Sequence, residues 1–337
     1  GNVNISNAQL ALGGGTATGS VLSPSPSRGG VRQFQADIQA RNIDTGFFAP
    51  NTSGLISADL NVSGSTATFS LDALQAGGRV DLPEGIASVP GPIAAQVEWD
   101  GRALSISDGV VLDRVRINGR IPFDVKRQRV GSLDLNVAMN QLPLSDIPQL
   151  PPDIPVNGFV SLNGRVTGEP DTLQLNSQLD LQQLDAAGFR FAALQGPLRW
   201  QPGANGVTID LQEPTATDEA GDRIAIQLDA SYIPLSFEVR QGQIEAIGQR
   251  VATEDDEFQV QLLNVPLDLA SAIVPGDVSG ILNSDFRINF ATRAVRGSAR
   301  ADELGWAGLQ LEQFQIPDTS PGTIALAKSN GTLSSCT

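Results

Sequence analysis

The sequence predicts an all-β fold: an elongated, curved antiparallel sheet of large repeats joined by short helical turns. Two observations predict it. Apolar and polar residues alternate along most of the 337 residues, and pairs of Gly, Pro, Asn and Asp separate the alternating runs. A period of two is typical of strands with one apolar and one polar face, and such residue pairs are typical of tight turns.

The clearest strand has Leu133, Leu135, Val137 and Met139 at alternate positions with mostly polar residues between them. The same pattern predicts strands over residues 34–40, 56–62, 173–181, 224–232 and 258–262. Tight turns are expected at six pairs, namely Gly77-Gly78, Asp100-Gly101, Asp108-Gly109, Asn118-Gly119, Asn205-Gly206 and Gln241-Gly242. Short helical turns are expected within residues 43–50, 142–148 and 266–276.

One run of residues returns three times, at 53–64, 157–168 and, more loosely, 279–290. Each copy is led by a glycine, and these glycines lie 104 (158 − 54) and 122 (280 − 158) residues apart. The third copy has Phe290 where Gly64 and Gly168 end the other two. The pattern predicts one continuous array over residues 1–337, with units near 1–130, 131–257 and 258–337. We interpret the chain as an internal piece of a longer protein.

The composition excludes several classes of function. The net charge is −15 and no cluster of Lys or Arg stands out, so no nucleic-acid partner is expected. The chain has no histidine, and Cys336 is its one cysteine, which removes Ser-His-Asp, Cys-His and most zinc chemistry. We therefore expect no enzyme, no cofactor and no metal. The acidic runs 218–222 and 254–257 are interpreted as solvated turns rather than calcium sites.

Aromatic residues make up only 5% of the chain, so an aliphatic surface without aromatic plugs is expected. Trp99 and Trp200 occupy similar positions behind Gly-Pro pairs, which favours a role in packing or at an edge over sugar stacking. Alternation alone favours a sandwich or barrel core, because a half-buried sheet needs a cover.

The order of these elements resembles the TamB family, AsmA-like proteins of the Gram-negative envelope with cyanobacterial and plastid relatives. The resemblance covers most of the chain. It is carried by the Leu-Pro-Leu turn at 142–144 with its counterpart at 265–267, the Gly-led strand 158–168, Glu169-Pro170, the strand 173–181, Gly188, and the Gly-Pro-Leu element 196–198.

The resemblance implies a half-open tube, or β-taco, in the periplasm, anchored to the inner membrane by segments outside this chain. Its apolar concave face would conduct phospholipid or another acyl lipid between inner and outer membrane. A linked role in outer-membrane biogenesis and protein secretion is implied, with an outer-membrane barrel assembly protein as partner through parts outside this chain.

Strand parity then assigns the lining of the lipid-binding groove to Leu133, Leu135, Val137, Leu173, Leu175, Leu179, Leu181, Ile224, Ile226 and Leu228. An alternative is a secreted or surface β-solenoid adhesin, a structural and binding protein. Such a solenoid would repeat every 20 to 30 residues, roughly, whereas this chain repeats at more than 100. A polysaccharide-active β-helix enzyme is a more distant alternative.

Overall fold

The computed structural model describes residues 2–25, 30–47, 53–68, 70–86, 89–147, 156–186, 189–202, 206–214, 221–251, 257–267, 269, 278–289, 292, 294–306 and 309–316. These residues form β-strands and short 3-10 turns, and the strands belong to a large antiparallel sheet that is not closed. The predicted all-β, antiparallel class is therefore confirmed.

The chain divides into two compact units. Unit 1 comprises Gly1–Asn140 and Leu162–Leu175, and unit 2 comprises Gln141–Ser161 and Asn176–Thr337. Strands β12 (Leu133–Pro143), β13 (Val156–Gly168) and β14 (Gln174–Ala186) contribute residues to both. The repeat boundaries expected near residues 130 and 257 stay predictions.

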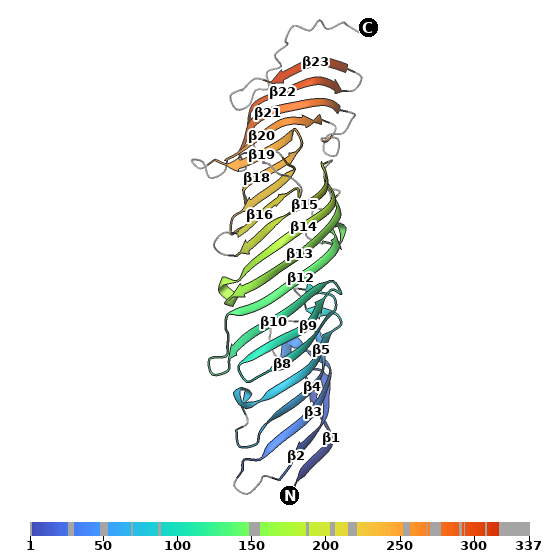
Figure 1. Cartoon of the computed structure of the whole chain (residues 1–337), viewed down its shortest axis with the longest axis vertical. Helices are drawn as coiled ribbons and strands as arrows, with labels where there is room; N and C mark the ends of the chain where they lie inside the picture. The colour runs from blue at the N-terminus through green and yellow to red at the C-terminus, as the bar shows by residue number, and fades with distance from the viewer. Residues whose placement is uncertain are drawn as a thin grey trace. The chain divides into compact units, whose positions relative to one another are not determined.

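Unit 1 consists of antiparallel strands that mostly pair in chain order, as Figure 1 shows. Its strands before β12 are β1 (Val3–Leu12), β2 (Gly15–Ser23), β3 (Gln33–Asp44), β4 (Leu55–Ser65), β5 (Gln75–Leu82), β8 (Ile93–Trp99), β9 (Ala103–Val111) and β10 (Val115–Asp124). The two-residue strands β6 (Gly85–Ile86) and β7 (Val89–Pro90) pair with each other, and β11 (Arg129–Val130) pairs with the end of β10.

Unit 2 follows the same plan. After β14 its strands are β15 (Phe189–Gln201), β16 (Gly206–Gln212), β17 (Arg223–Leu228), β18 (Pro234–Gln241), β19 (Ile244–Arg250), β20 (Glu257–Pro266), β21 (Val278–Asn289), β22 (Ala294–Trp306) and β23 (Leu309–Ile316). From β15 onward each strand pairs with the next in antiparallel register.

Short 3-10 turns lie between several strands. Two of them, η1 (Thr45–Phe47) and η3 (Leu144–Asp146), lie within the predicted segments 43–50 and 142–148 and confirm a short helical turn in each. Two more, η2 (Leu71–Ala73) and η4 (Pro170–Thr172), were not predicted. Most of the third expected segment, 266–276, lies outside the described residues.

The three repeat copies share a backbone feature that sequence reasoning missed. A residue with positive φ precedes each 3-10 segment: Asn42 (φ 52°), Gln141 (φ 47°) and Asn264 (φ 53°). In each case its backbone N–H donates to the side chain three residues after the leading glycine, at Ser57 (3.4 Å), Ser161 (2.9 Å) or Asn283 (2.9 Å). The structure therefore shows one local hydrogen-bonding arrangement at the same place in all three copies.

The leading glycines of the later two copies also share a conformation. Gly158 has φ 126° and Gly280 has φ 125°, a region that disfavours residues with a Cβ. A Cβ on Gly158 would lie 2.9 Å from the carbonyl oxygen of Gln183, and one on Gly280 would lie 3.0 Å from that of Glu303. The third copy thus begins as the second does, while Phe290 at its end lies outside the described residues.

Three of the predicted turns were wrong. Gly77-Gly78, Asp108-Gly109 and Asn118-Gly119 lie inside β5, β9 and β10, respectively. Gly78 (φ 155°) and Gly119 (φ 144°) serve close approach of neighbouring strands, because a Cβ there would meet the backbone oxygen of Asp59 or Asp134. Asp108 (φ 49°) lies in a β-bulge, where the register of β9 shifts against both neighbours.

The other predicted turns are confirmed only in part. Asp100-Gly101 connects β8 to β9. The turn between β18 and β19 lies one residue later than predicted, at Gly242-Gln243, because Gln241 is the last residue of β18 and pairs with Ile244. Asn205 lies outside the described residues, and Gly206 opens β16. The strand expected over 224–232 was too long: it ends at Leu228, because the Asp229 carboxylate accepts the N–H groups of Ser231 (2.8 Å) and Ile233 (2.9 Å) and holds a turn.

Replacing Ser161 by alanine is expected to lower the free energy of unfolding by about 0.5–1 kcal/mol, because the N–H of Gln141 loses its acceptor. Ser57→Ala is the matched control and is expected to cost less, since its Oγ lies 3.4 Å from the nitrogen of Asn42. Urea unfolding followed by circular dichroism measures both. A Ser57→Ala loss equal to or larger than that of Ser161→Ala would contradict this assignment.

Candidate functional site

The registers of unit 1 align apolar residues and glycines in one row across eight strands, from β2 to β12. The row consists of Gly19, Ile38, Leu60, Gly78, Val97, Ile106, Gly119 and Leu135. We call it the unit 1 apolar row. Seven strand spacings of about 4.8 Å give it a length of about 34 Å, roughly twice the hydrocarbon thickness of one membrane leaflet.

Every member of the unit 1 apolar row is half-buried: none is enclosed and none is fully exposed. Parallel to it runs a second set of small and apolar residues, which comprises Val21, Ala36, Val62, Ala76, Trp99, Leu104 and Ile121. Side chains of the described residues therefore leave part of this apolar surface accessible. A surface of this kind can take up an extended aliphatic ligand.

A similar row crosses eight strands of unit 2, from β15 to β22. It consists of Leu198, Ile209, Ile226, Phe237, Gly248, Val260, Phe286 and Gly297, and we call it the unit 2 apolar row. This face is more enclosed, since Val260 is 8% exposed and Leu211, beside the row, is 1% exposed. Unit 2 thus combines accessible apolar positions with a small core.

The structure brings several of the predicted groove residues together. Leu133, Leu135 and Val137 lie on the apolar face of β12, and the last two pair with Gly119 and Ile117 of β10. In unit 2, Ile224, Ile226 and Leu228 of β17 pair with apolar residues on both sides, which are Leu211, Ile209 and Val207 of β16 and Val239, Phe237 and Pro234 of β18.

The four remaining predicted residues lie at or before β14. Leu175 and Leu181 are half-buried in β14, and Leu179 is 9% exposed and belongs to the core. Leu173 follows η4 and precedes the strand. Between Leu175 and Leu179, the hydroxyl of Ser177 donates to the carbonyl oxygen of Leu198 at 3.2 Å. Leu173 and Leu175 belong to unit 1, whereas Leu179 and Leu181 belong to unit 2.

The expectation that the apolar surface has no aromatic plugs was wrong for unit 2. The rings of Phe237 and Phe258 stack with their centroids 5.9 Å apart and their planes at 15°. A Cβ on Gly248, which lies on the strand between them, would meet a ring carbon of each. Few aromatic residues are present, but the register of β18, β19 and β20 gathers two of them at one position.

The opposite face of each unit is polar and carries ion pairs between strands. In unit 2 a charged ladder crosses β16 to β19: Arg223 pairs with Asp210 (3.0 Å) and Glu238 (3.0 Å), and Arg240 pairs with Glu238 (2.9 Å) and Glu245 (2.9 Å). In unit 1 Arg165 pairs with Asp134 at 2.6 Å. These pairs keep that face hydrophilic and make the two faces chemically distinct.

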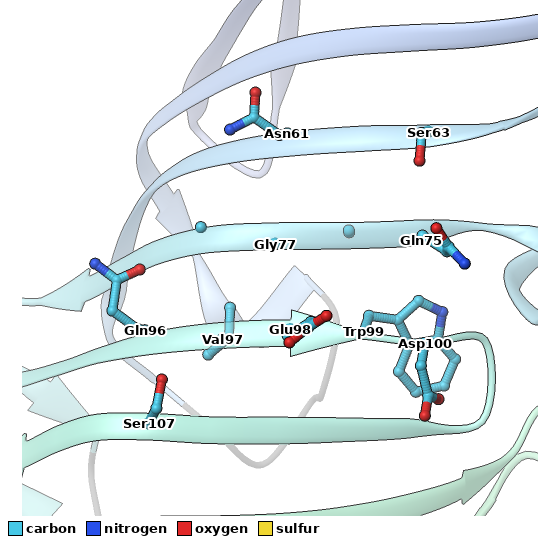
Figure 2. A pocket seen from close by; sticks show the side chains of 12 residues that line it. Asn61, Ser63, Gln75, Gly77, Gln96, Val97, Glu98, Trp99, Asp100 and Ser107 are labelled. Carbon is cyan, nitrogen blue, oxygen red and sulfur yellow. The ribbon is translucent and has the colours of Figure 1, made fainter.

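The polar face of unit 1 also contains a hollow of about 570 Å³. Figure 2 shows Gly77 lying between the strand that carries Asn61 and Ser63 and the strand that carries Gln96 and Glu98. A Cβ on Gly77 would meet the carbonyl oxygen of Val97 at 3.7 Å, an ordinary contact distance, so a small side chain would fit into the hollow. Its amide and carboxylate groups could hydrogen-bond a small polar molecule, and none of the predicted groove residues lines it.

Both described indole rings are tied to turns at the strand ends. The Nε1–H of Trp99 donates to the carbonyl oxygen of Leu71 at 2.8 Å, and the ring meets Phe123 edge-on at 6.3 Å. The Nε1–H of Trp200 donates to the hydroxyl of Tyr232 at 3.2 Å. The side chain of Trp306 lies outside what is described. These contacts give Trp99 and Trp200 a packing role at the sheet edge.

The described residues provide neither a metal centre nor a membrane-spanning helix. Among the described residues no group of three or more His, Cys, Asp or Glu side chains is arranged to hold a metal ion. Most of the acidic runs 218–222 and 254–257 lies outside those residues. No helix in the described part of the chain is long and apolar enough to cross a bilayer.

Asp229 is expected to make the stability of unit 2 sensitive to acid. Its backbone hydrogen bonds from Ile233 and Ser231, together with the charge of Arg250, hold the pKa of the carboxyl below its ordinary value of 3.8. A lowered pKa contributes stability that is present above the ordinary value and lost as pH falls through the folded-state value. Urea midpoints should therefore drop below pH 3.8, and Asp229→Asn should show a smaller difference between pH 7 and pH 3. An unchanged difference would contradict this role.

Comparison with known proteins gave no relative. No family model matches the chain, and no curated protein or solved structure is significantly similar to it.

Proposed function

We propose that this chain is a periplasmic, non-enzymatic segment of a TamB-like bridge, which holds the acyl chains of lipids on its apolar face and conducts them between the inner and outer membrane. Anchoring to the inner membrane, and contact with an outer-membrane barrel assembly protein during outer-membrane biogenesis, would be supplied by segments outside this chain. The proposal combines the resemblance in element order with the two apolar rows.

The observation that carries the proposal is the unit 1 apolar row. Eight neighbouring strands present apolar side chains or glycines at one level, all half-buried, while the adjacent positions on the other face are polar. A sandwich or barrel core would enclose such a row, since a sheet normally covers its apolar face with another layer. A half-covered row suits a ligand that completes the cover.

The energetics favour an acyl chain as this ligand. Burial of apolar surface contributes about 0.8 kcal/mol per CH₂ group, so a chain of roughly ten covered CH₂ groups would gain about 8 kcal/mol before the entropic cost of binding. Small residues such as Gly19, Gly78 and Gly119 set few steric demands along the unit 1 apolar row. Affinity without strict shape selection is what a lipid conduit requires.

The proposal is tested by purifying the folded chain from a Gram-negative host without detergent and identifying bound lipids by native mass spectrometry. Phospholipids or other acyl lipids that remain bound to the folded chain are the expected result. A chain that stays folded and monodisperse but carries no acyl lipid, and takes none up from phosphatidylethanolamine vesicles, would contradict the proposal.

A further inference from the structure

The Phe237–Phe258 pair occupies a defined position on the unit 2 apolar row. Phe237 on β18 pairs with Gly248 on β19, and Gly248 pairs with Val260 on β20. Phe258 enters from the same face, since it pairs with Arg250, two residues beyond Gly248. The two rings therefore converge above Gly248, the position of β19 that has no side chain.

Gly248 makes this convergence possible. A Cβ at this position would meet Cε1 of both Phe237 and Phe258, so any larger residue would have to displace the rings. Gly248 is not among the glycines with positive φ, so its backbone is open to other residues. Space for the two rings is therefore the structural role of this glycine that the described contacts support.

Side chains of the protein itself fill the apolar face at this point. Phe258 is 4% exposed and Val260 is 8% exposed, whereas every member of the unit 1 apolar row is half-buried. A ligand cannot lie against side chains that are already enclosed. The Phe237–Phe258 pair thus interrupts the accessible part of the unit 2 apolar row.

A charged pair lies next to the rings on the same face. Arg250 shares the face of Gly248, and its guanidinium lies 3.5 Å from the Asp229 carboxylate, with the two side chains 30% and 27% exposed. An ion pair is an unfavourable neighbour for an acyl chain, because covering it would remove both charges from water. Rings and ion pair together make this position of the apolar face poorly suited to lipid.

We infer that the Phe237–Phe258 pair is a barrier on the apolar face of unit 2, which restricts acyl chains to the surface on either side of it. The inference rests on the proposed function and adds to it a position that controls occupancy. Within this account Phe237, Phe258 and Gly248 determine how much lipid unit 2 can hold, and the remaining residues of the unit 2 apolar row provide the contact surface.

The test compares the purified chain with the single variant Phe237→Leu and the double variant Phe237→Leu/Phe258→Leu. Leucine keeps the face apolar and removes the rings. Phe286→Leu is the matched control, because Phe286 belongs to the same row on β21 but not to the stacked pair. Each protein is loaded with a phosphatidylethanolamine that carries a diazirine in its acyl chain, irradiated, digested and mapped by mass spectrometry.

The expected result is a crosslinked peptide from residues 244–250 in both Phe237 variants, with none in the wild type or in Phe286→Leu. Phe237→Leu keeps the test valid if the double variant loses its fold, because Phe237 is only half-buried. Lipid bound to the wild type and already crosslinked at residues 244–250, or an unchanged map in the Phe237 variants, would overturn the barrier alone. Failure of every variant and the wild type to bind lipid would remove the proposed function and the barrier together.

Discussion

Replacing Ile226 by glutamate is expected to abolish lipid binding over β16 and β17, on one side of the Phe237–Phe258 pair, while the chain stays folded. Ile226 is half-buried in the middle of the unit 2 apolar row, with Ile209 and Phe237 as its neighbours on the adjoining strands. In the lipid-free protein the new carboxylate would keep part of its hydration, so the cost to folding stays moderate. An acyl chain laid over the carboxylate would remove that hydration. The cost is several kcal/mol, which is about as large as the whole gain from burying the acyl chain.

The matched control is Gln227→Glu, one residue further along β17. Gln227 is exposed on the polar face and pairs with Thr208 and Ser236. The Gln227→Glu substitution introduces the same charge on the same strand but on the other face, so lipid binding should be unchanged. Circular dichroism and quantified bound phospholipid give the two measurements. Equal loss of lipid in both variants, or unfolding of Ile226→Glu alone, would argue against an accessible apolar face at this strand.

Leu211→Ala is expected to cause a large loss of stability in unit 2. Leu211 is 1% exposed and pairs with Ile224 of β17. Deleting a buried leucine side chain removes its transfer free energy and leaves a cavity, which together cost about 2–5 kcal/mol. Leu228→Ala is the matched control. Leu228 is half-buried on the neighbouring strand, so its truncation should lower the free energy of unfolding by about 1 kcal/mol.

Urea unfolding measures both variants. The expected order, with Leu211→Ala clearly below Leu228→Ala in midpoint, would separate the small core of unit 2 from its accessible surface. Similar losses at the two positions would mean that unit 2 has no such division. In that case the apolar face would behave as one continuous core, and the binding surface in unit 2 would have to be abandoned.

The period of two in the sequence predicted where most of the strands lie, because a register with one apolar face tolerates no slip. The interruptions of that period were not understood. In β3 the apolar face passes from Ala40 to Ile43, and in β20 from Leu262 to Val265, with one extra residue at a bulge in each strand. The bulge changes the apolar residues from even to odd positions or the reverse, and keeps their side chains on the same face of the sheet. The sequence did contain a signal for these bulges: two face-forming apolar residues lie three positions apart instead of two, with Asn42 or Asn264 between them.

The glycine pairs were misread for a physical reason. Glycine is typical of turns, but it is also required where backbones approach closely, and composition alone does not separate the two. Gly77-Gly78 and Asn118-Gly119 are followed by residues that continue the alternation, for example Val80 after Gly78 and Ile121 after Gly119. That continuity distinguishes them from Gln241-Gly242, where the strand direction reverses.

The candidate site was predictable in part. Parity grouped Ile224, Ile226 and Leu228 on one face, and the structure brings them together with neighbours from both adjoining strands. The Phe237–Phe258 pair was not predicted, because its rings are 21 residues apart (258 − 237) and meet only through the hairpins around β19. The position of Phe237 opposite Gly248 follows from the turn Gly242-Gln243, which lies one residue beyond the predicted pair.

The most direct test of the central claim is to map which face of unit 1 contacts lipid. The diazirine-labelled phosphatidylethanolamine should crosslink to Leu60, Val97 and Ile106 of the unit 1 apolar row and spare their immediate neighbours Asp59, Gln96 and Ser107 on the polar face. Alternation of labelled and unlabelled residues along β4, β8 and β9 is the result that the account predicts. Labelling of both faces alike, or labelling of Gln96, Glu98 and Ser107 in the hollow without Val97, would contradict it.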